Sequence, residues 1–179
     1  MALGGYSYGA RVALHVALRY PERVRQLIVL SASRGIENPI ERAARVRRDE
    51  ELAAHIEHVG VEVFLDEWLS QPMFSQLPAD PLERAARSDD ALGLARSLRS
   101  SGTGTQTFLG PQMKNLRMRT LAVAGGEDAK FSAEALAIAE LAPRASAHLI
   151  DGAGHAAHLE KPVECADVIA HFLSSASAS

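Results

Sequence analysis

Short apolar segments recur along the chain and predict the buried strands of a parallel sheet. Gln26–Leu30 and residues 120–124 are continuous or nearly continuous apolar runs, as expected for strands covered on both faces. Residues 145–150 form a further strand, and residues 3–5 end another that runs into a tight turn. The pattern therefore predicts a sheet of about four strands.

Apolar residues at helical spacing predict the connections between these strands. After the first strand they stand at positions 10, 13, 14, 17 and 18, and Pro21 ends the helix because the residue before a proline is biased out of helical geometry. Further helices are expected over about 132–141 and near the C-terminus, where Ala166, Ile169, Ala170 and Leu173 share one face. Strand–helix alternation with short links predicts an α/β fold with right-handed crossovers.

The middle of the chain lacks strand signals and predicts a helical insertion. Its Ala-, Arg-, Glu- and Leu-rich sequence indicates helices over about 40–58, 61–70, 81–88 and 90–99, separated by Gly60, Pro72, Pro78 and Pro81. We expect residues 1–39 and 101–179 to form the core, and residues 40–100 to form a lid.

Composition excludes several classes of function. The chain has 179 residues, of which 47% are hydrophobic, and 19 basic against 22 acidic residues give a net charge of −3. This balance offers no basic surface for nucleic acid and no membrane signal. Cys165 is the only cysteine, which excludes an intrachain disulfide, and no secretory leader pattern is present. We expect a cytoplasmic protein with neither nucleic acid nor membrane as a partner.

The segment Gly5-Tyr6-Ser7-Tyr8-Gly9 fits the G-x-S-x-G pattern of a nucleophile elbow. In such an elbow the serine stands on a sharp strand-to-helix turn, and glycines flank it because side chains would clash with the neighbouring strand and helix. Its position between a strand and an amphipathic helix supports this interpretation. The amide of Tyr8 is then the expected oxyanion donor.

A serine hydroxyl needs an imidazole to take its proton, and the imidazole needs an acid to orient it. His155 follows a predicted strand in a glycine-rich loop, with His158 as its rival, and Asp128 follows another strand after two glycines. Two other acids are less suitable. Glu127 should point away from the histidine, because neighbouring loop residues diverge, and Asp151 is too close in sequence to His155 to reach behind its ring. The order Ser7, Asp128, His155 is that of α/β-hydrolases. No metal or cofactor is implied.

Several further segments indicate which family of α/β-hydrolase-fold enzymes the chain resembles. They are residues 5–14 and 18–24, Trp68 with residues 71–74, residues 97–99 with 102–104, residues 125–131 and residues 154–160. Together they resemble the synthases of 2-succinyl-6-hydroxy-2,4-cyclohexadiene-1-carboxylate (SHCHC) in menaquinone biosynthesis. The resemblance implies the C-terminal portion of an α/β-hydrolase fold with a helical lid, acting as a lyase that removes a ring proton and eliminates pyruvate from an enolpyruvyl precursor.

The resemblance also implies roles for individual residues. Ser7 would act as the base, supported by His155 and Asp128, on a small anionic carboxylate substrate. Arg11 and Arg87 match arginines expected to bind its carboxylates, although a solvated helix face explains Arg87 equally well. Tyr6 and Trp68 would shape the pocket, although plain packing explains both residues at least as well.

The position of the elbow near the start of the chain departs from the family pattern. About 80 further residues would normally precede it and supply more strands and the second oxyanion donor. We therefore expect that a missing N-terminal segment, or another subunit such as a second copy, completes the fold. Two alternatives to the lyase remain open, which are a serine hydrolase of esters or carbon–carbon bonds and an inactive fragment or partner subunit.

Overall fold

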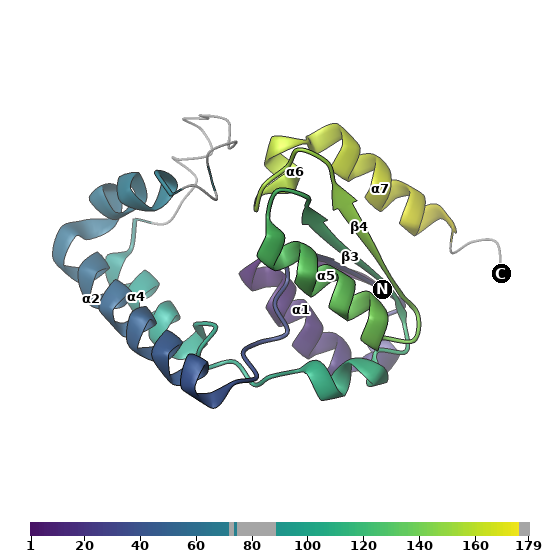
Figure 1. The fold of residues 1–179 in the computed structure, drawn as a ribbon, viewed down its shortest axis with the longest axis horizontal. Coiled ribbons are helices and arrows are strands. Elements are labelled where there is room, and N and C mark those ends of the chain that lie inside the picture. Colours follow the sequence, from purple (N-terminus) through teal and green to yellow (C-terminus); the bar gives the residue numbers. More distant parts are fainter. Residues whose placement is uncertain (72–73, 75–88, 176–179) are drawn as a thin grey trace. The chain divides into compact units, whose positions relative to one another are not determined.

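A computed structural model of the chain describes residues 1–71, 74 and 89–175 (Figure 1). The helix predicted over residues 81–88 lies outside these residues. The chain divides into two compact units, which are Met1–Arg34 with Leu109–Ser179, here called the sheet unit, and Gly35–Phe108, here called the helical unit.

The sheet unit contains the predicted parallel sheet. Its strands are β1 (Ala2–Tyr6), β2 (Gln26–Leu30), β3 (Arg119–Gly125) and β4 (Ala145–Ile150), and they lie side by side in that order. All neighbouring pairs are parallel. The carboxyl ends of the four strands therefore meet at one edge of the sheet.

Helices cover both faces of this sheet. α1 (Tyr8–Arg19) and α5 (Ala129–Leu141) pack against one face, and α7 (Pro162–Ser174) packs against the other (Figure 1). The α5 helix begins before the predicted residue 132 because the Asp128 side chain accepts a hydrogen bond from the Phe131 amide and caps the first turn. The short helix α6 (Ala157–Glu160) follows the histidine loop.

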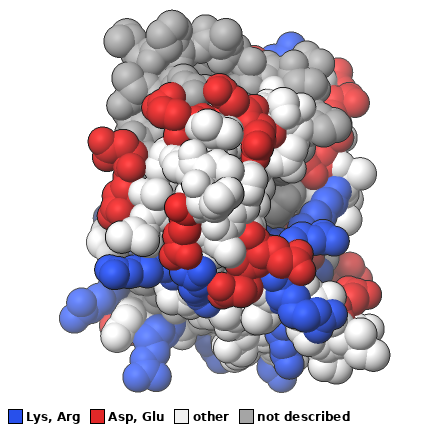
Figure 2. Space-filling view, turned by 90° about the vertical axis from the view of Figure 1, so that its left-hand side faces the viewer, with Lys and Arg blue, Asp and Glu red and all other residues white. Residues whose placement is uncertain are grey.

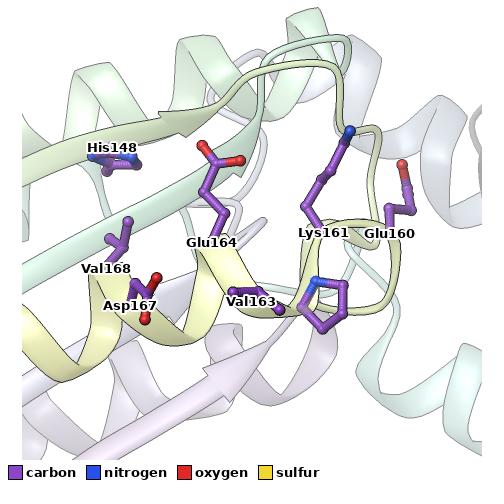
Figure 3. Close-up of a pocket in the computed structure, with 8 residues that line it drawn as sticks. His148, Glu160, Lys161, Val163, Glu164, Asp167 and Val168 are labelled. Carbon is purple, nitrogen blue, oxygen red and sulfur yellow. The ribbon is translucent and has the colours of Figure 1, made fainter.

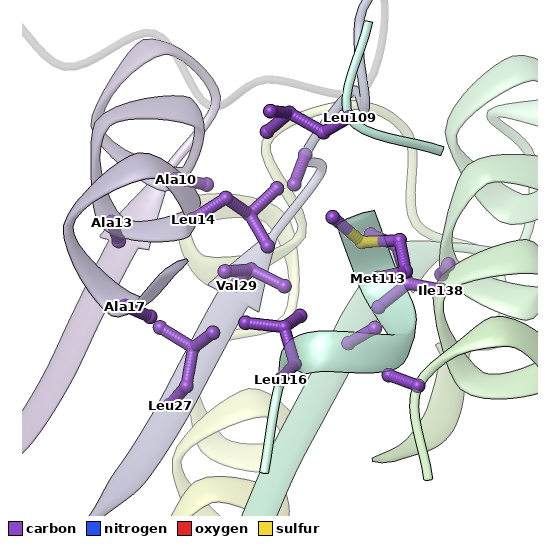
Figure 4. Close-up of a cluster of buried hydrophobic side chains, with 14 of the residues drawn as sticks. Ala10, Ala13, Leu14, Ala17, Leu27, Val29, Leu109, Met113, Leu116 and Ile138 are labelled. Atoms are coloured by element: carbon purple, nitrogen blue, oxygen red, sulfur yellow. The ribbon is translucent and has the colours of Figure 1, made fainter. Parts of the chain in front are cut away.

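Alternation along the strands divides the buried side chains between two clusters. The larger cluster lies between the sheet and helices α1 and α5 (Figure 4), and includes Ala13, Leu14, Leu27, Val29, Ala122 and Ile138. The second cluster lies under α7 and includes Ile28, Leu121, Val123, Ile150 and Phe172. Adjacent strand residues thus serve opposite faces, as the continuous apolar runs predicted.

A 3-10 helix over Gly110–Asn115 completes the larger cluster and was not predicted. Its Met113 and the following Leu116 are both fully buried. A segment this short has too few residues for a periodic pattern, so it could not be predicted from hydrophobic spacing. It closes the core beneath α1 and α5.

The helical unit is built from α2 (Pro39–Leu69) and α4 (Ala91–Ser101). α2 joins the two helices predicted over 40–58 and 61–70, and Gly60 between them adopts φ 80° and ψ 170°. These angles are open to glycine and interrupt the helix there. The unit has its own apolar cluster, in which Ile56, Val61, Phe64 and Leu65 are buried.

The structure divides the chain at residues 34/35 and 108/109, whereas the sequence boundaries stood at 39/40 and 100/101. Gly35 has φ +94° and lies so close to the returning segment that a Cβ there would stand 3.0 Å from the Thr107 carbonyl oxygen. On the sheet side, the Leu109 amide donates to the Arg34 carbonyl at 2.7 Å. The connecting segments therefore pack with the helical unit, which a boundary based on helix starts overlooks.

Charges are unevenly distributed along α2. Arg42, Arg45, Arg47 and Arg48 lie near its start, while residues 51–69 contain acidic side chains and no lysine or arginine. Figure 2 shows basic side chains gathered in the lower part of one surface and acidic ones above them. Arg99 of α4 binds the carboxylates of both Glu50 and Glu57, at 2.9 and 2.6 Å.

No helix among the described residues combines the length and apolarity needed to cross a bilayer.

Replacing Ile138 with alanine should destabilise the sheet unit strongly. Ile138 is 0% exposed in the larger cluster, so the truncation leaves a cavity and should lower the free energy of unfolding by about 2–5 kcal/mol. Leu136→Ala is the matched control on the same helix, since Leu136 is 54% exposed and should cost less than about 0.5 kcal/mol. Denaturant unfolding measures both, and equal losses would contradict the assignment of the core.

Candidate active site

Ser7 stands on the sharp turn between β1 and α1. Its backbone adopts φ 49° and ψ −108°, a strained conformation for a residue with a side chain. Two hydrogen bonds hold the turn, one from the Ser7 amide to the Leu30 carbonyl at 2.8 Å and one from the Arg11 amide to the Ser7 carbonyl at 3.1 Å. The predicted elbow geometry is therefore present.

Only one of the two elbow glycines is required by close packing. A Cβ at Gly5 would stand 2.4 Å from the carbonyl carbon and oxygen of Gly9, both backbone atoms. At Gly9 itself an added Cβ would meet none of the described atoms within 4 Å. The expectation that both flanking positions exclude side chains is therefore wrong for Gly9, because the described residues outside its own helix leave open space there.

The structure brings Ser7, His155 and Asp128 together from three separate loops. The Ser7 hydroxyl oxygen lies 3.2 Å from Nε2 of His155, and Nδ1 of the same ring lies 3.0 Å from Oδ2 of Asp128. Hydroxyl, imidazole and carboxylate thus form a continuous hydrogen-bonded series. This arrangement can pass a proton from the hydroxyl to the ring while the carboxylate stabilises the resulting imidazolium.

The loops that carry Asp128 and His155 pack together because Gly125 has no side chain. A Cβ at Gly125 would stand 2.0 Å from the Gly154 carbonyl oxygen and 2.3 Å from that of Ala153. The Glu127 amide donates to the Ala153 carbonyl at 2.9 Å and links the same two loops. Gly125 at the end of β3 therefore allows the acid to reach the imidazole.

Asp128 uses its two carboxylate oxygens for different tasks. Oδ1 accepts the Phe131 amide at 3.1 Å and Oδ2 contacts His155. Burial acts to raise the pKa of Asp128, but the hydrogen bonds from His155 and the Phe131 amide, with nearby positive charge, bring that pKa below its ordinary value. The carboxylate is therefore held in its ionised form.

The His155 ring is enclosed by aromatic side chains. Phe131 packs on it with ring centroids 4.5 Å apart, and Tyr6 lies at 5.4 Å. His155 is only 5% exposed. The Ser31 hydroxyl donates to the His155 carbonyl at 2.8 Å, and Ser31 is itself buried with φ 48°. The imidazole is thus fixed from its ring and from its backbone.

The first turn of α1 places positive character beside Ser7. The Tyr8 amide is one of the first N–H groups of this helix, which have no acceptor within it, and the helix dipole adds to their positive potential. The Arg11 guanidinium lies 5.1 Å from the centre of the Tyr8 ring. The roles of Tyr8 in an oxyanion hole and of Arg11 in substrate binding stay predictions.

The rival residues lie in other surroundings. Glu127 and Asp151 are exposed, and Asp128 rather than either of them contacts the His155 ring. The His158 ring packs on Tyr6 with centroids 4.3 Å apart, so Tyr6 lies between two histidines. Tyr6 is therefore beside the candidate site, as expected for a residue that shapes it.

The other predicted binding residues are not brought to the triad by the described contacts. Trp68 belongs to the helical unit, where its ring stacks on Phe64 at 5.6 Å. Arg87 lies outside the described residues. Both roles stay predictions, and packing accounts for the Trp68 contact that the structure provides.

Outside the triad, the described residues form a cavity between β4 and α7 and no cluster of metal ligands. Among these residues no group of histidine, cysteine and carboxylate side chains could hold a metal ion. A cavity of about 570 Å³ lies beside β4 and α7 (Figure 3), lined in part by His148, Lys161 and Glu164. None of the triad residues lines it, so it is separate from the candidate active site.

Comparison with known proteins assigns the family. A family model described as the alpha/beta hydrolase family matches residues 2–168. The chain belongs to this family. The parallel sheet, the elbow after β1 and the order of the three site residues agree with that membership.

Proteins that share the name SHCHC synthase match almost the whole chain in sequence. A putative SHCHC synthase of Bacillus subtilis is 34% identical over 96% of this chain and 65% of its own length. An SHCHC synthase of Escherichia coli is 34% identical over 96% of this chain and 67% of its own length. The chain thus spans about two thirds of the length of these relatives.

Solved structures show the same fold. The structure of MenH from Staphylococcus aureus matches with a TM-score of 0.90 and 33% identity, covering 96% of this chain and 67% of that one. A thermophilic esterase from Thermogutta terrifontis matches with a TM-score of 0.76 at 22% identity, covering 98% of this chain and 65% of that one. The second likeness concerns the fold alone.

Replacing Gly5 with alanine should disrupt the elbow. The new methyl group would overlap the Gly9 backbone at 2.4 Å, so the turn must move and shift the Ser7 hydroxyl away from His155. We expect the labelling rate of Ser7 by a fluorophosphonate probe to fall by about 100-fold or more. Gly9→Ala is the control and should retain most of the rate, so equal losses in both variants would contradict this geometry.

The Asp128 carboxylate should contribute a pH-dependent part of stability. Because its pKa is lower in the folded state, this contribution is present above its ordinary pKa of about 3.9 and is lost as the pH falls through the folded-state value. The difference in unfolding free energy between wild type and Asp128→Asn should therefore be constant above about pH 5 and shrink towards about pH 3. Denaturant titrations across this range measure it, and a difference that does not change with pH would refute the lowered pKa.

Proposed function

We propose that this alpha/beta hydrolase relative is an SHCHC synthase-type lyase. In this reaction a proton leaves the ring of an enolpyruvyl-succinyl-cyclohexene carboxylate, the bond from the ring to the enolpyruvyl oxygen breaks, and pyruvate departs. The observation that carries the proposal is the hydrogen-bonded Ser7–His155–Asp128 series in a chain whose relatives at 34% identity bear the SHCHC synthase name.

The triad supplies the base that such an elimination needs. His155 accepts the Ser7 proton through Nε2, and Asp128 stabilises the imidazolium through Nδ1. The serine oxygen then removes the ring proton of the substrate, and the electron pair of the broken C–H bond moves through the ring as the C–O bond breaks. The imidazolium of His155 gives its proton to the departing enolate, which becomes pyruvate, and Ser7 keeps the ring proton, so the triad is regenerated.

Positive groups near Ser7 suit an anionic substrate. The proton removal develops negative charge, which the Tyr8 amide and the dipole of α1 would stabilise. Arg11, one turn further along α1, would bind a carboxylate, because a guanidinium matches a carboxylate with paired hydrogen bonds. Tyr6 would line the pocket from its position beside His155.

The remaining predicted parts of the site would complete this pocket. Trp68 and Arg87 of the helical unit would contact the substrate, and that unit would serve as a lid that excludes water. A second oxyanion donor would come from a segment or subunit outside this chain, since the chain spans about two thirds of the curated relatives. We expect no metal or cofactor to be required, because the proton transfer needs only the triad.

Pyruvate release tests the proposal directly. The chain, incubated with the enolpyruvyl precursor, should release pyruvate, measured by coupled NADH oxidation with lactate dehydrogenase. Ser7→Ala should lower the rate by about 10³-fold or more, because it removes the base. The Escherichia coli relative serves as the positive control for the assay. Release no faster than from Ser7→Ala would refute lyase activity of this chain.

A serine hydrolase is the second candidate, because the same Ser7–His155 contact can activate a nucleophile. The two functions differ in the role of Ser7, which is a covalent nucleophile in a hydrolase and a base in the lyase. A hydrolase should cleave a simple ester and pass through an acyl group on Ser7, which mass spectrometry detects. Labelling by a fluorophosphonate without ester turnover, together with pyruvate release, would favour the lyase.

A further inference from the structure

We propose that Glu160 is a positioning residue for His155, holding the histidine loop so that the imidazole reaches Ser7 and Asp128 together. The inference depends on the proposed triad but not on the identity of the substrate. It rests on the contacts of one carboxylate with the two backbone amides on either side of His155.

The carboxylate of Glu160 binds the histidine loop with both of its oxygens. Oε2 accepts a hydrogen bond from the Gly154 amide, and Oε1 accepts one from the Ala156 amide at 3.0 Å. Because the acceptor is ionised, both bonds are stronger than those between neutral groups. One side chain thereby fixes the amides of the two residues that flank His155 in the chain.

The histidine loop needs such a restraint because it contains no helix or strand of its own. It runs from the end of β4 at Ile150 to the start of α6 at Ala157, and it includes Gly152 with φ +62°. Glycines at positions 152 and 154 give the backbone wide conformational freedom. Since Gly154 and Ala156 are buried, their amides have no ready access to solvent as an alternative partner.

The Glu160 contacts also complement the others made by His155. Ser31 fixes the carbonyl of His155 at 2.8 Å, while Asp128 fixes Nδ1 of the ring at 3.0 Å. The Ala156 amide lies in the peptide plane that follows His155, and the Gly154 amide lies in the plane between residues 153 and 154. By holding both amides, Glu160 restrains the backbone on each side of His155 and so the direction of its Cα–Cβ bond. A small rotation there would move Nε2 away from the Ser7 hydroxyl.

Glu160 lies at the end of α6, where its carboxylate reaches back to the residue before the helix. A glutamate that binds the amide at the start of its own helix resembles a capping box, which would be a purely structural role. The additional bond to Gly154, outside the helix, extends the contact across His155. A test must therefore separate helix stability from the placement of the imidazole.

Glu164 provides a matched control. It is an exposed carboxylate in the first turn of α7, and it lines the same cavity as Glu160 (Figure 3). Glu164→Gln removes the same charge as Glu160→Gln. Glu160→Gln keeps the length of the side chain and one acceptor oxygen, whereas Glu160→Ala removes both acceptors.

The experiment compares Ser7 labelling and the state of the His155 ring in the intact chain. Wild type and Glu164→Gln should react with a fluorophosphonate at rates within about twofold, while Glu160→Ala should react about 10- to 100-fold more slowly. Glu160→Gln should fall between them. In proton NMR, the signal of the His155 Nδ1–H should be sharp in wild type and Glu164→Gln, and broadened or lost in Glu160→Ala.

Rates are measured at a temperature where circular dichroism shows every variant folded, and Glu160→Gln serves alone if Glu160→Ala does not fold. Wild-type labelling and an unchanged Nδ1–H signal in the Glu160 variants would overturn the proposal, even if they unfold more easily. A wild-type chain without a protected Nδ1–H would overturn it as well. Pyruvate release is not used, so failure of the lyase assay leaves this test independent.

Discussion

Four parallel strands end at one edge of the sheet, and the loops that follow three of them carry Ser7, Asp128 and His155. Parallel pairing fixes this arrangement, because every strand must run in the same direction and each returning helix lies outside the sheet. The register of β1, β2 and β3 then aligns the strand ends. The distances of 3.2 and 3.0 Å within the triad depend on that alignment.

The loops at this edge are shaped by contacts that serve structure and site together. Asp128 caps α5 with one oxygen and orients His155 with the other. Gly125 lets the acid loop and the histidine loop touch, and Glu160 binds the backbone on both sides of His155. Strained backbone at Ser7 and Ser31 persists because the surrounding strands hold it. These contacts hold the three site residues in the geometry described.

The chemistry of such a site is set by what binds beside the triad. An activated serine can remove a proton or attack a carbonyl, and the fold does not choose between these outcomes. The start of α1 places the Tyr8 amide and the positive end of the helix dipole beside Ser7. The helical unit has its own apolar cluster, and Arg99 links its two helices through Glu50 and Glu57.

The sequence by itself determined the strands, the amphipathic face of α1, the elbow around Ser7 and the order of the three site residues, because these depend on neighbours along the chain. It also favoured Asp128 over Glu127 and Asp151, and the structure places Asp128 on the imidazole. Only the tertiary structure decided that Gly5 but not Gly9 is needed for close packing, where the two units divide, and that Glu160 binds the histidine loop. These features arise where segments meet in space, and no local pattern of residues encodes the distance between two loops.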